Sequence, residues 1–193
     1  IARKNVFMLH SKLISNLNNI KYSENYNDEF ILARIHSIEK NENESVIQFL
    51  DFITLLLEKG YKDFGTEGKM RQHAHFLMQS KDIRIQEMVL MLRRHEKDFI
   101  IRKEIEYCDK FLNTATELRD IINNSHEKNK ETLIKELDKY QYLFIKLKQL
   151  QFLLGVKENE GKLGEMKKKR ELLDVNYQET KSHIMGLEKS YEK

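Results

Sequence analysis

The chain of 193 residues contains no proline, and this absence limits the folds that it can form. At the average usage of about 5%, roughly ten prolines would be expected in a chain of this length. Proline ends helices, and together with glycine it forms most of the turns of compact β and α/β folds. Only 7 glycines are present, whereas hydrophobic residues reach 40% and charged residues 34%. The composition therefore predicts an all-α fold of long helices joined by few turns.

Breaks between the helices are expected at clusters of Gly, Asn, Ser and Asp. Between these clusters, apolar residues recur at helical spacing, which predicts helices over 2–21, 28–40, 44–59, 67–101, 104–123, 128–157 and 162–193. Narrow apolar seams favour an elongated up-down bundle of about six helices that pack as in four-helix bundles. The pattern leaves open whether the helices form one bundle or two stacked modules.

Charge, cysteine content and missing motifs exclude several classes of function. The net charge is only +3, with acids and bases interleaved, which argues against nucleic-acid binding. The single cysteine, Cys108, excludes an internal disulfide and a metal site built from several cysteines. His95 and Glu96 lack the second histidine of a zinc-protease helix, and the di-iron, phosphate-loop and catalytic-elbow patterns are missing. We expect no metal, no cofactor and no enzymatic activity in this segment.

The longest apolar seam lies at the C-terminal end. Its members alternate three and four residues apart, as at the a and d positions of a coiled coil: Leu163, Met166, Arg170, Leu173, Tyr177, Thr180, Ile184, Leu187 and Tyr191. Arg170 is the charged member of the seam. A polar residue there often fixes the register of packing. The alternatives are a pair with a buried carboxylate, for which Glu96 is the candidate, or a contact with a small anionic ligand.

One turn pattern occurs in both halves of the chain. Two glycines three residues apart are followed by a charge, a methionine and a base, in Gly65-Thr66-Glu67-Gly68-Lys69-Met70-Arg71 and in Gly161-Lys162-Leu163-Gly164-Glu165-Met166-Lys167. The repeat predicts two similar halves, roughly 1–102 and 103–193, within a single all-helical domain over 1–193. After the first turn, Arg71 and His75 share a helix face. They form a candidate cationic pocket for a carboxylate, with simple solvent exposure as the alternative.

A charged run lies near the middle of the chain and comprises Arg93, Arg94, His95, Glu96, Lys97 and Asp98. Pairs of Arg94 with Asp98 and of Asp98 with Arg102, each four residues apart, account for its exposed part. Glu96 differs, because it lies about 40° from Leu92 around the helix and therefore on the apolar face. A carboxylate on that face needs a partner, since an unpaired buried charge is very costly.

The same run, from Leu92 to Phe99 and on to Arg102 and Tyr107, resembles a motif of the helical bimodular family of extracytoplasmic sensor domains. These domains occur in bacterial chemoreceptors and histidine kinases. In that family, the run ends a long helix and is preceded by a Gly-x-x-Gly turn, an arginine and a histidine. The matching residues are Gly65, Gly68, Arg71 and His75, and a second turn matches at Gly161 and Gly164. The second turn departs from the pattern, because Lys167 and Glu171 stand where the family favours arginine and histidine.

The resemblance implies a periplasmic, ligand-sensing domain of a transmembrane receptor with kinase or chemotaxis output. It implies flanking membrane helices, both termini at the membrane-proximal end, a homodimer, and a small-molecule ligand such as an organic acid or an amino acid. We take Arg71, His75 and Arg170 as the candidate ligand-binding residues. The charged run and the four turn glycines are taken as a structural motif. A cytosolic helical scaffold that binds partner helices is the alternative function.

Overall fold

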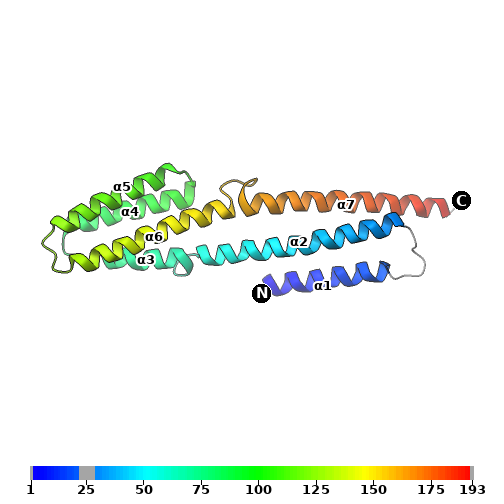
Figure 1. The fold of residues 1–193 in the computed structure, drawn as a ribbon, viewed down its shortest axis with the longest axis horizontal. Helices are drawn as coiled ribbons and strands as arrows, with labels where there is room; N and C mark the ends of the chain where they lie inside the picture. The colour runs from blue at the N-terminus through cyan, green and yellow to red at the C-terminus, as the bar shows by residue number, and fades with distance from the viewer. Residues whose placement is uncertain (1, 22–28, 192–193) are drawn as a thin grey trace. The chain divides into compact units, whose positions relative to one another are not determined.

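The structure is a computed structural model that describes residues 2–21 and 29–191. These residues form seven helices and no strand (Figure 1). In chain order the helices are α1 (Ala2–Lys21), α2 (Glu29–Lys59), α3 (Gly65–Leu77), α4 (Ile83–Arg102), α5 (Glu106–Asn124), α6 (Lys130–Leu154) and α7 (Gly161–Tyr191). The all-α, up-down helical bundle predicted from the sequence is therefore confirmed.

The chain divides into two compact units. Unit 1 comprises Ile1–Ile53 and Lys157–Lys193, and so contains α1, most of α2, and α7. Unit 2 is the continuous segment Thr54–Val156, which holds the end of α2 and all of α3 to α6. This division differs from the sequential halves 1–102 and 103–193, because the last helix belongs with the first two. That residues 1–193 act as a single sensor domain stays a prediction.

Unit 2 is a four-helix bundle with one continuous apolar core. Contacts of α3 with α6, α6 with α5, α5 with α4 and α4 with α3 close the ring of helices. Three helices meet at an aromatic cluster, where the ring of Phe111 stacks on that of Phe144 with centroids 3.8 Å apart. Tyr140 and Phe99 approach these two rings edge-on, at 5.2 and 5.6 Å. Such arrangements add about 0.5–1.5 kcal/mol per ring pair to the gain from burial.

The prediction of one helix over 67–101 is wrong, because α3 and α4 are separated by residues 78–82. The Asp82 side chain accepts a hydrogen bond from the backbone N–H of Arg84 at 3.0 Å and caps the start of α4. Such a cap satisfies a backbone donor that the first turn of a helix leaves unpaired. The polar residues before α4 therefore stop the helix without proline or glycine.

The interruption predicted at 41–43 is also wrong, because α2 runs unbroken from Glu29 to Lys59. Asn41 is buried in this helix, and its side-chain oxygen accepts a hydrogen bond from Lys169 of α7 at 2.7 Å. Glu44, one turn further along α2, also pairs with Lys169. Contacts with α7 thus satisfy polar groups that would otherwise favour a turn.

Within unit 1, α1 and α7 both run antiparallel to α2. On one side, His10 of α1 lies 3.0 Å from Asn43, and Leu13 and Ile14 pack against Ile31 and Ile35 of α2. On the other side, Lys169 bonds to Asn41, while Arg34 bonds to Asn176 at 3.2 Å. Residue numbers therefore fall along α1 and α7 as they rise along α2.

This arrangement places the start of α1 and the end of α7 at opposite ends of unit 1. Two helices that are both antiparallel to a third must run parallel to each other. The expectation that the two ends of the chain lie together is therefore wrong for the ends of α1 and α7.

The seam predicted along α7 is partly wrong. Met166, Leu173 and Thr180 face inward as expected, but Arg170 is exposed and Tyr177 is 60% exposed. In their places, Lys169 and Asn176 face α2 and bond to its polar side chains. The side chains of Leu187 and Tyr191 lie outside those that the structure describes. Polar pairing with α2 has turned the helix away from the face that hydrophobicity alone predicts.

The two glycine turns, residues 63–68 and 159–164, share one local structure. Gly65 and Gly161 begin α3 and α7 with φ angles of 63° and 55°, a left-handed conformation that glycine adopts without strain. A Cβ atom on Gly68 would lie 2.2 Å from the backbone C and O of Asp63. A Cβ atom on Gly164 would lie 2.3 Å from the same atoms of Asn159. The repeated sequence pattern thus corresponds to a repeated close approach of two backbone segments.

We predict that Gly68→Ala and Gly164→Ala each destabilise the protein by about 1–3 kcal/mol, because the added methyl group must push the backbone apart. The control is Gly186→Ala, since a Cβ atom on this helical residue meets nothing within 4 Å. The control should raise stability by roughly 0.5–1 kcal/mol, the usual gain from alanine in a helix. Denaturant unfolding of the three variants measures these changes. Equal effects at all three positions would contradict the shared turn geometry.

Candidate functional site

The basic residue three positions after the second glycine of each turn forms a hydrogen bond with the first residue of that turn. The guanidinium of Arg71 donates to the Asp63 carboxylate at 3.1 Å, and the ammonium of Lys167 donates to the Asn159 side-chain oxygen at 3.1 Å. Each base thus bonds to the residue eight positions earlier. His75 is exposed on α3. The structure therefore ties Arg71 to its own turn and does not bring it into a pocket with His75.

Arg170 lines a groove between α2 and α7 in unit 1. The groove has a volume of about 390 Å³ and is lined by Ser45, Gln48, Met166, Lys167, Arg170 and Leu173. The side-chain oxygen of Gln48 is buried and has no hydrogen-bond partner among the described residues. The hydroxyl of Ser45 donates to the backbone oxygen of Asn41 at 2.8 Å. Of the three predicted ligand-binding residues, Arg170 is the one that lines this groove.

Glu96 is fully buried in unit 2 and has three partners. Arg93 lies 2.8 Å from both carboxylate oxygens, and Lys97 lies 3.1 Å from one of them. The phenol of Tyr140, on α6, donates to the other oxygen at 2.5 Å. The prediction that Glu96 is buried and paired is confirmed, whereas the proposed partner Arg170 is wrong. Charge-assisted bonds of this kind are stronger than neutral ones, and they compensate for the removal of the carboxylate from water.

The Glu96 network makes Tyr140 hard to ionise. Burial raises the pKa of Tyr140 well above its ordinary value, and the nearby negative charge of Glu96 raises it further. Sequence analysis missed this partner, because helical spacing marks Tyr140 only as a member of an apolar seam with Leu143 and Leu147. The signal available was a hydroxyl group within that seam, since a buried tyrosine usually finds an acceptor.

The remainder of the charged run lies nearer the surface. Asp98 lies 4.0 Å from Arg94 and 3.5 Å from Arg102, which confirms both predicted pairs. His95 is half-buried, and its Nδ1 atom has no hydrogen-bond partner in the part of the chain that the structure describes. Burial lowers the pKa of His95, and the charge of Lys110 lowers it further. The run is therefore one buried acid surrounded by half-buried and exposed charges.

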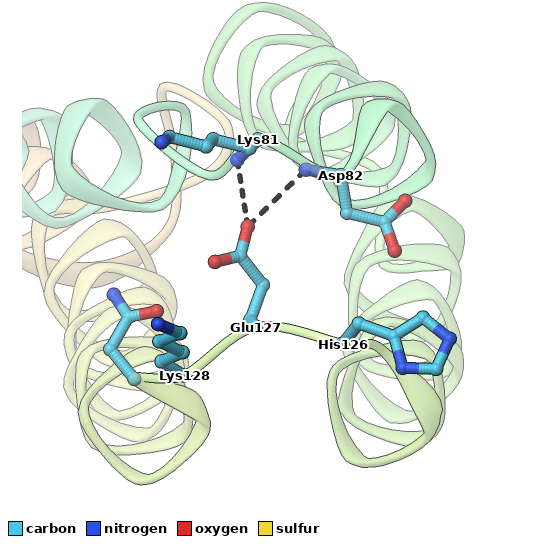
Figure 2. A pocket seen from close by; sticks show the side chains of 6 residues that line it. Lys81, Asp82, His126, Glu127 and Lys128 are labelled. Carbon is cyan, nitrogen blue, oxygen red and sulfur yellow. Dashed lines mark hydrogen bonds between the residues drawn. The ribbon is translucent and has the colours of Figure 1, made fainter.

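A second polar pocket lies at one end of unit 2, where the loop between α3 and α4 meets the loop between α5 and α6. Figure 2 shows the carboxylate of Glu127 pointing at the backbone of Lys81 and Asp82. One oxygen accepts from these two N–H groups at 2.7 and 3.2 Å, and from the Ser80 hydroxyl at 2.5 Å. These bonds, with that of Ser80 the largest cause, lower the pKa of Glu127. The pocket measures about 570 Å³. The backbone N–H groups before α4, which could otherwise bind an anion, already donate to the Glu127 carboxylate.

Sequence analysis also missed Glu127. A single glutamate in a short polar loop carries no pattern that distinguishes it from the many other glutamates of the chain. Its role follows from two loops, 78–82 and 125–129, that meet only in the folded bundle.

Three further features of the described residues bear on function, namely possible metal ligands, the thiol of Cys108 and the apolar character of the helices. No group of three or more His, Cys, Asp or Glu side chains among them is placed to hold a metal ion. Burial raises the pKa of Cys108 to about 11, so its thiol stays neutral and unreactive at neutral pH. Within the same residues, no helix combines the length and the apolar character needed to cross a membrane.

We predict that Glu96→Ala lowers the free energy of unfolding by about 3–5 kcal/mol, because Arg93 and the Tyr140 hydroxyl lose their buried partner. The matched control is Glu117→Ala on α5, where the side chain is exposed and the change should stay within about 0.5 kcal/mol. Guanidinium unfolding of both variants measures the difference. A loss at Glu96 as small as the control's would show that the network adds nothing to stability.

Alkaline titration gives a second prediction for the same network. Because folding raises the pKa of Tyr140, its stabilising effect is complete below the ordinary tyrosine pKa and is lost as the pH rises through the folded value. Tyrosinate absorbance should therefore show one late-ionising group that Tyr140→Phe removes. Tyr142→Phe is the control, since this side chain is 67% exposed and lies outside the Glu96 network. Loss of the late phase in the control instead would contradict the assignment.

Comparisons with protein-family models, with curated proteins and with solved structures found no match to this chain. Its function must therefore be argued from the geometry above.

Proposed function

We propose that the chain is the ligand-sensing part of an extracytoplasmic receptor of the histidine-kinase or chemotaxis type. The groove beside Arg170 carries the proposal, because it combines a cation, an unpaired buried acceptor and apolar side chains. Such a combination is typical of sites for small molecules. The resemblance to helical bimodular sensor domains adds support, since its two Gly-x-x-Gly turns share one geometry here.

The groove lies beside an interface that can shift at low cost. Among the described residues, the apolar core of unit 1 holds only two fully buried hydrophobic side chains, Ile31 and Ile35. Beside the apolar contact of Ile184 with these two residues, polar bonds of Lys169 and Arg34 join α7 to α2. Regions with few buried apolar contacts open at the lowest free energy. A ligand that binds one position of α7 more tightly than another would bias that equilibrium.

The proposal makes α7 the output element. This helix extends 31 residues from the second glycine turn to Tyr191, so a displacement at the groove can be carried along it. In the receptor, segments outside this chain would anchor it in the membrane, with the groove on the periplasmic side and the protein as a homodimer. The opposite placement of the ends of α1 and α7 in unit 1 is why α7 alone is assigned the output.

A cytosolic helical scaffold is the second candidate function. One observation favours it: α7 exposes several large apolar side chains, among them Leu172 at 47%, Val175 at 53% and Tyr177 at 60%. A partner helix could cover them, as in other helix-in-groove contacts. This function predicts self-association or partner binding without a response to small molecules.

A thermal-shift screen of the purified chain separates the two functions. The sensor predicts that at least one compound in a panel of organic acids and amino acids raises the melting temperature, since a ligand at about 100 times its Kd adds about 2.7 kcal/mol to stability. Sedimentation at several protein concentrations is run in parallel. A flat panel together with strong self-association would reject the sensor and favour the scaffold.

A further inference from the structure

The groove between α2 and α7 has the size and the lining of a small-molecule binding site. Its volume of about 390 Å³ lies within the range of about 300–1,000 Å³ that is common for small-molecule pockets. Two of its six lining residues are basic and none is acidic. The lining side chains therefore attract an anionic occupant, and none of them is a carboxylate that would repel it.

The first feature that a ligand of this groove would have to match is the side chain of Gln48. Its side-chain oxygen is buried and has no hydrogen-bond partner among the described residues. A buried acceptor without a partner destabilises the folded state, and such groups are rare in folded proteins. Ser45 cannot meet the need, because its hydroxyl proton is used by the backbone oxygen of Asn41. A small rotation of the Gln48 side chain toward the groove would let an occupant that brings a donor pair with this oxygen.

Arg170 supplies the second requirement. Lys167 is engaged by Asn159 at 3.1 Å and faces Glu158 at 3.9 Å. No carboxylate in the described part of the chain forms an ion pair with Arg170. A guanidinium group presents paired N–H donors that match the two oxygens of a carboxylate. The glycine turn thus takes one base and leaves the other for a ligand.

Met166 and Leu173 supply the third requirement. Both are half-buried and lie on the same face of α7 as Arg170, four residues before it and three after it. They give the groove an apolar wall beside its cation. A short hydrocarbon chain on the ligand would bury this wall.

We propose that the groove binds a small carboxylate with a neutral O–H or N–H donor on the adjacent carbon and a short apolar chain, as in 2-hydroxy acids and N-acyl amino acids. The carboxylate pairs with Arg170, the donor meets the Gln48 oxygen, and the apolar chain lies against Met166 and Leu173. A free ammonium group is disfavoured, because Lys167 and Arg170 both line the groove. This inference rests on the proposed sensor function and names its ligand class.

The test is calorimetric titration of the full chain with 2-hydroxyisocaproate, with isocaproate, which lacks the hydroxyl, and with leucine and N-acetylleucine. Wild-type protein should bind the hydroxy acid or the N-acetyl compound roughly tenfold more tightly than isocaproate, and more tightly than leucine. Preference between the two favoured probes identifies which neutral donor the groove accepts.

Two variants assign the contacts. Arg170→Gln should weaken binding of both acids by roughly tenfold to a hundredfold, because a charge-assisted bond is lost. Gln48→Leu keeps the size of the side chain but removes the acceptor, so it should abolish the preference for the hydroxy acid over isocaproate. Arg94→Gln is the control, since this arginine is 73% exposed on α4 and lies outside the groove. Its affinities should equal those of the wild type.

Failure to bind the hydroxy acid and the N-acetyl compound would overturn the inference, as would binding that neither Arg170→Gln nor Gln48→Leu alters. If another compound of the panel raises the melting temperature and is insensitive to both variants, this site is wrong while the sensor proposal stands. If no compound of the panel binds, both are rejected.

Discussion

Two close approaches of backbone segments, one at each glycine turn, set where α3 and α7 begin. Gly68 and Gly164 lack the side-chain atom that would collide with Asp63 and Asn159, so α3 and α7 can begin against the turn before them. The base that follows each second glycine then closes its turn by bonding to the same residue. This second contact occupies the basic side chain that follows each turn. In unit 1 it engages Lys167 and leaves Arg170, one turn later, to line the groove.

The two units differ in how they are held together. Unit 2 has a continuous apolar core and a buried acid, Glu96, whose partners come from two helices. Breaking such a network is costly, so it favours a single arrangement of α4 and α6. In unit 1, α2 and α7 meet through polar contacts of Arg34 and Lys169 and through a small apolar contact, in which Ile184 packs against Ile31 and Ile35. The apolar core of unit 1 is much smaller than that of unit 2, so α7 can change position at a lower free-energy cost than the helices of unit 2.

The sequence was sufficient for the fold class and for the burial of Glu96, because both follow from helical periodicity and the cost of a buried charge. It placed Arg170 on the inward face of α7, whereas Lys169, one residue earlier, faces inward. Lys169 meets Asn41 and Glu44, which are more than a hundred residues away along the chain. The break between α3 and α4 and the role of Tyr140 were missed for a similar reason. Polar contacts formed only in the folded chain decide them, and hydrophobic patterning does not record such contacts.

A small carboxylate bound between α2 and α7 is proposed to stabilise one position of α7. Hydrogen exchange of the full chain, with and without saturating 2-hydroxyisocaproate, tests it most directly, because amide protection reports the free energy of local opening. Binding in this groove predicts slower exchange around residues 45–48 and 166–173, with α3 to α6 unchanged. Unchanged exchange in these two segments, or protection confined to unit 2, would contradict it.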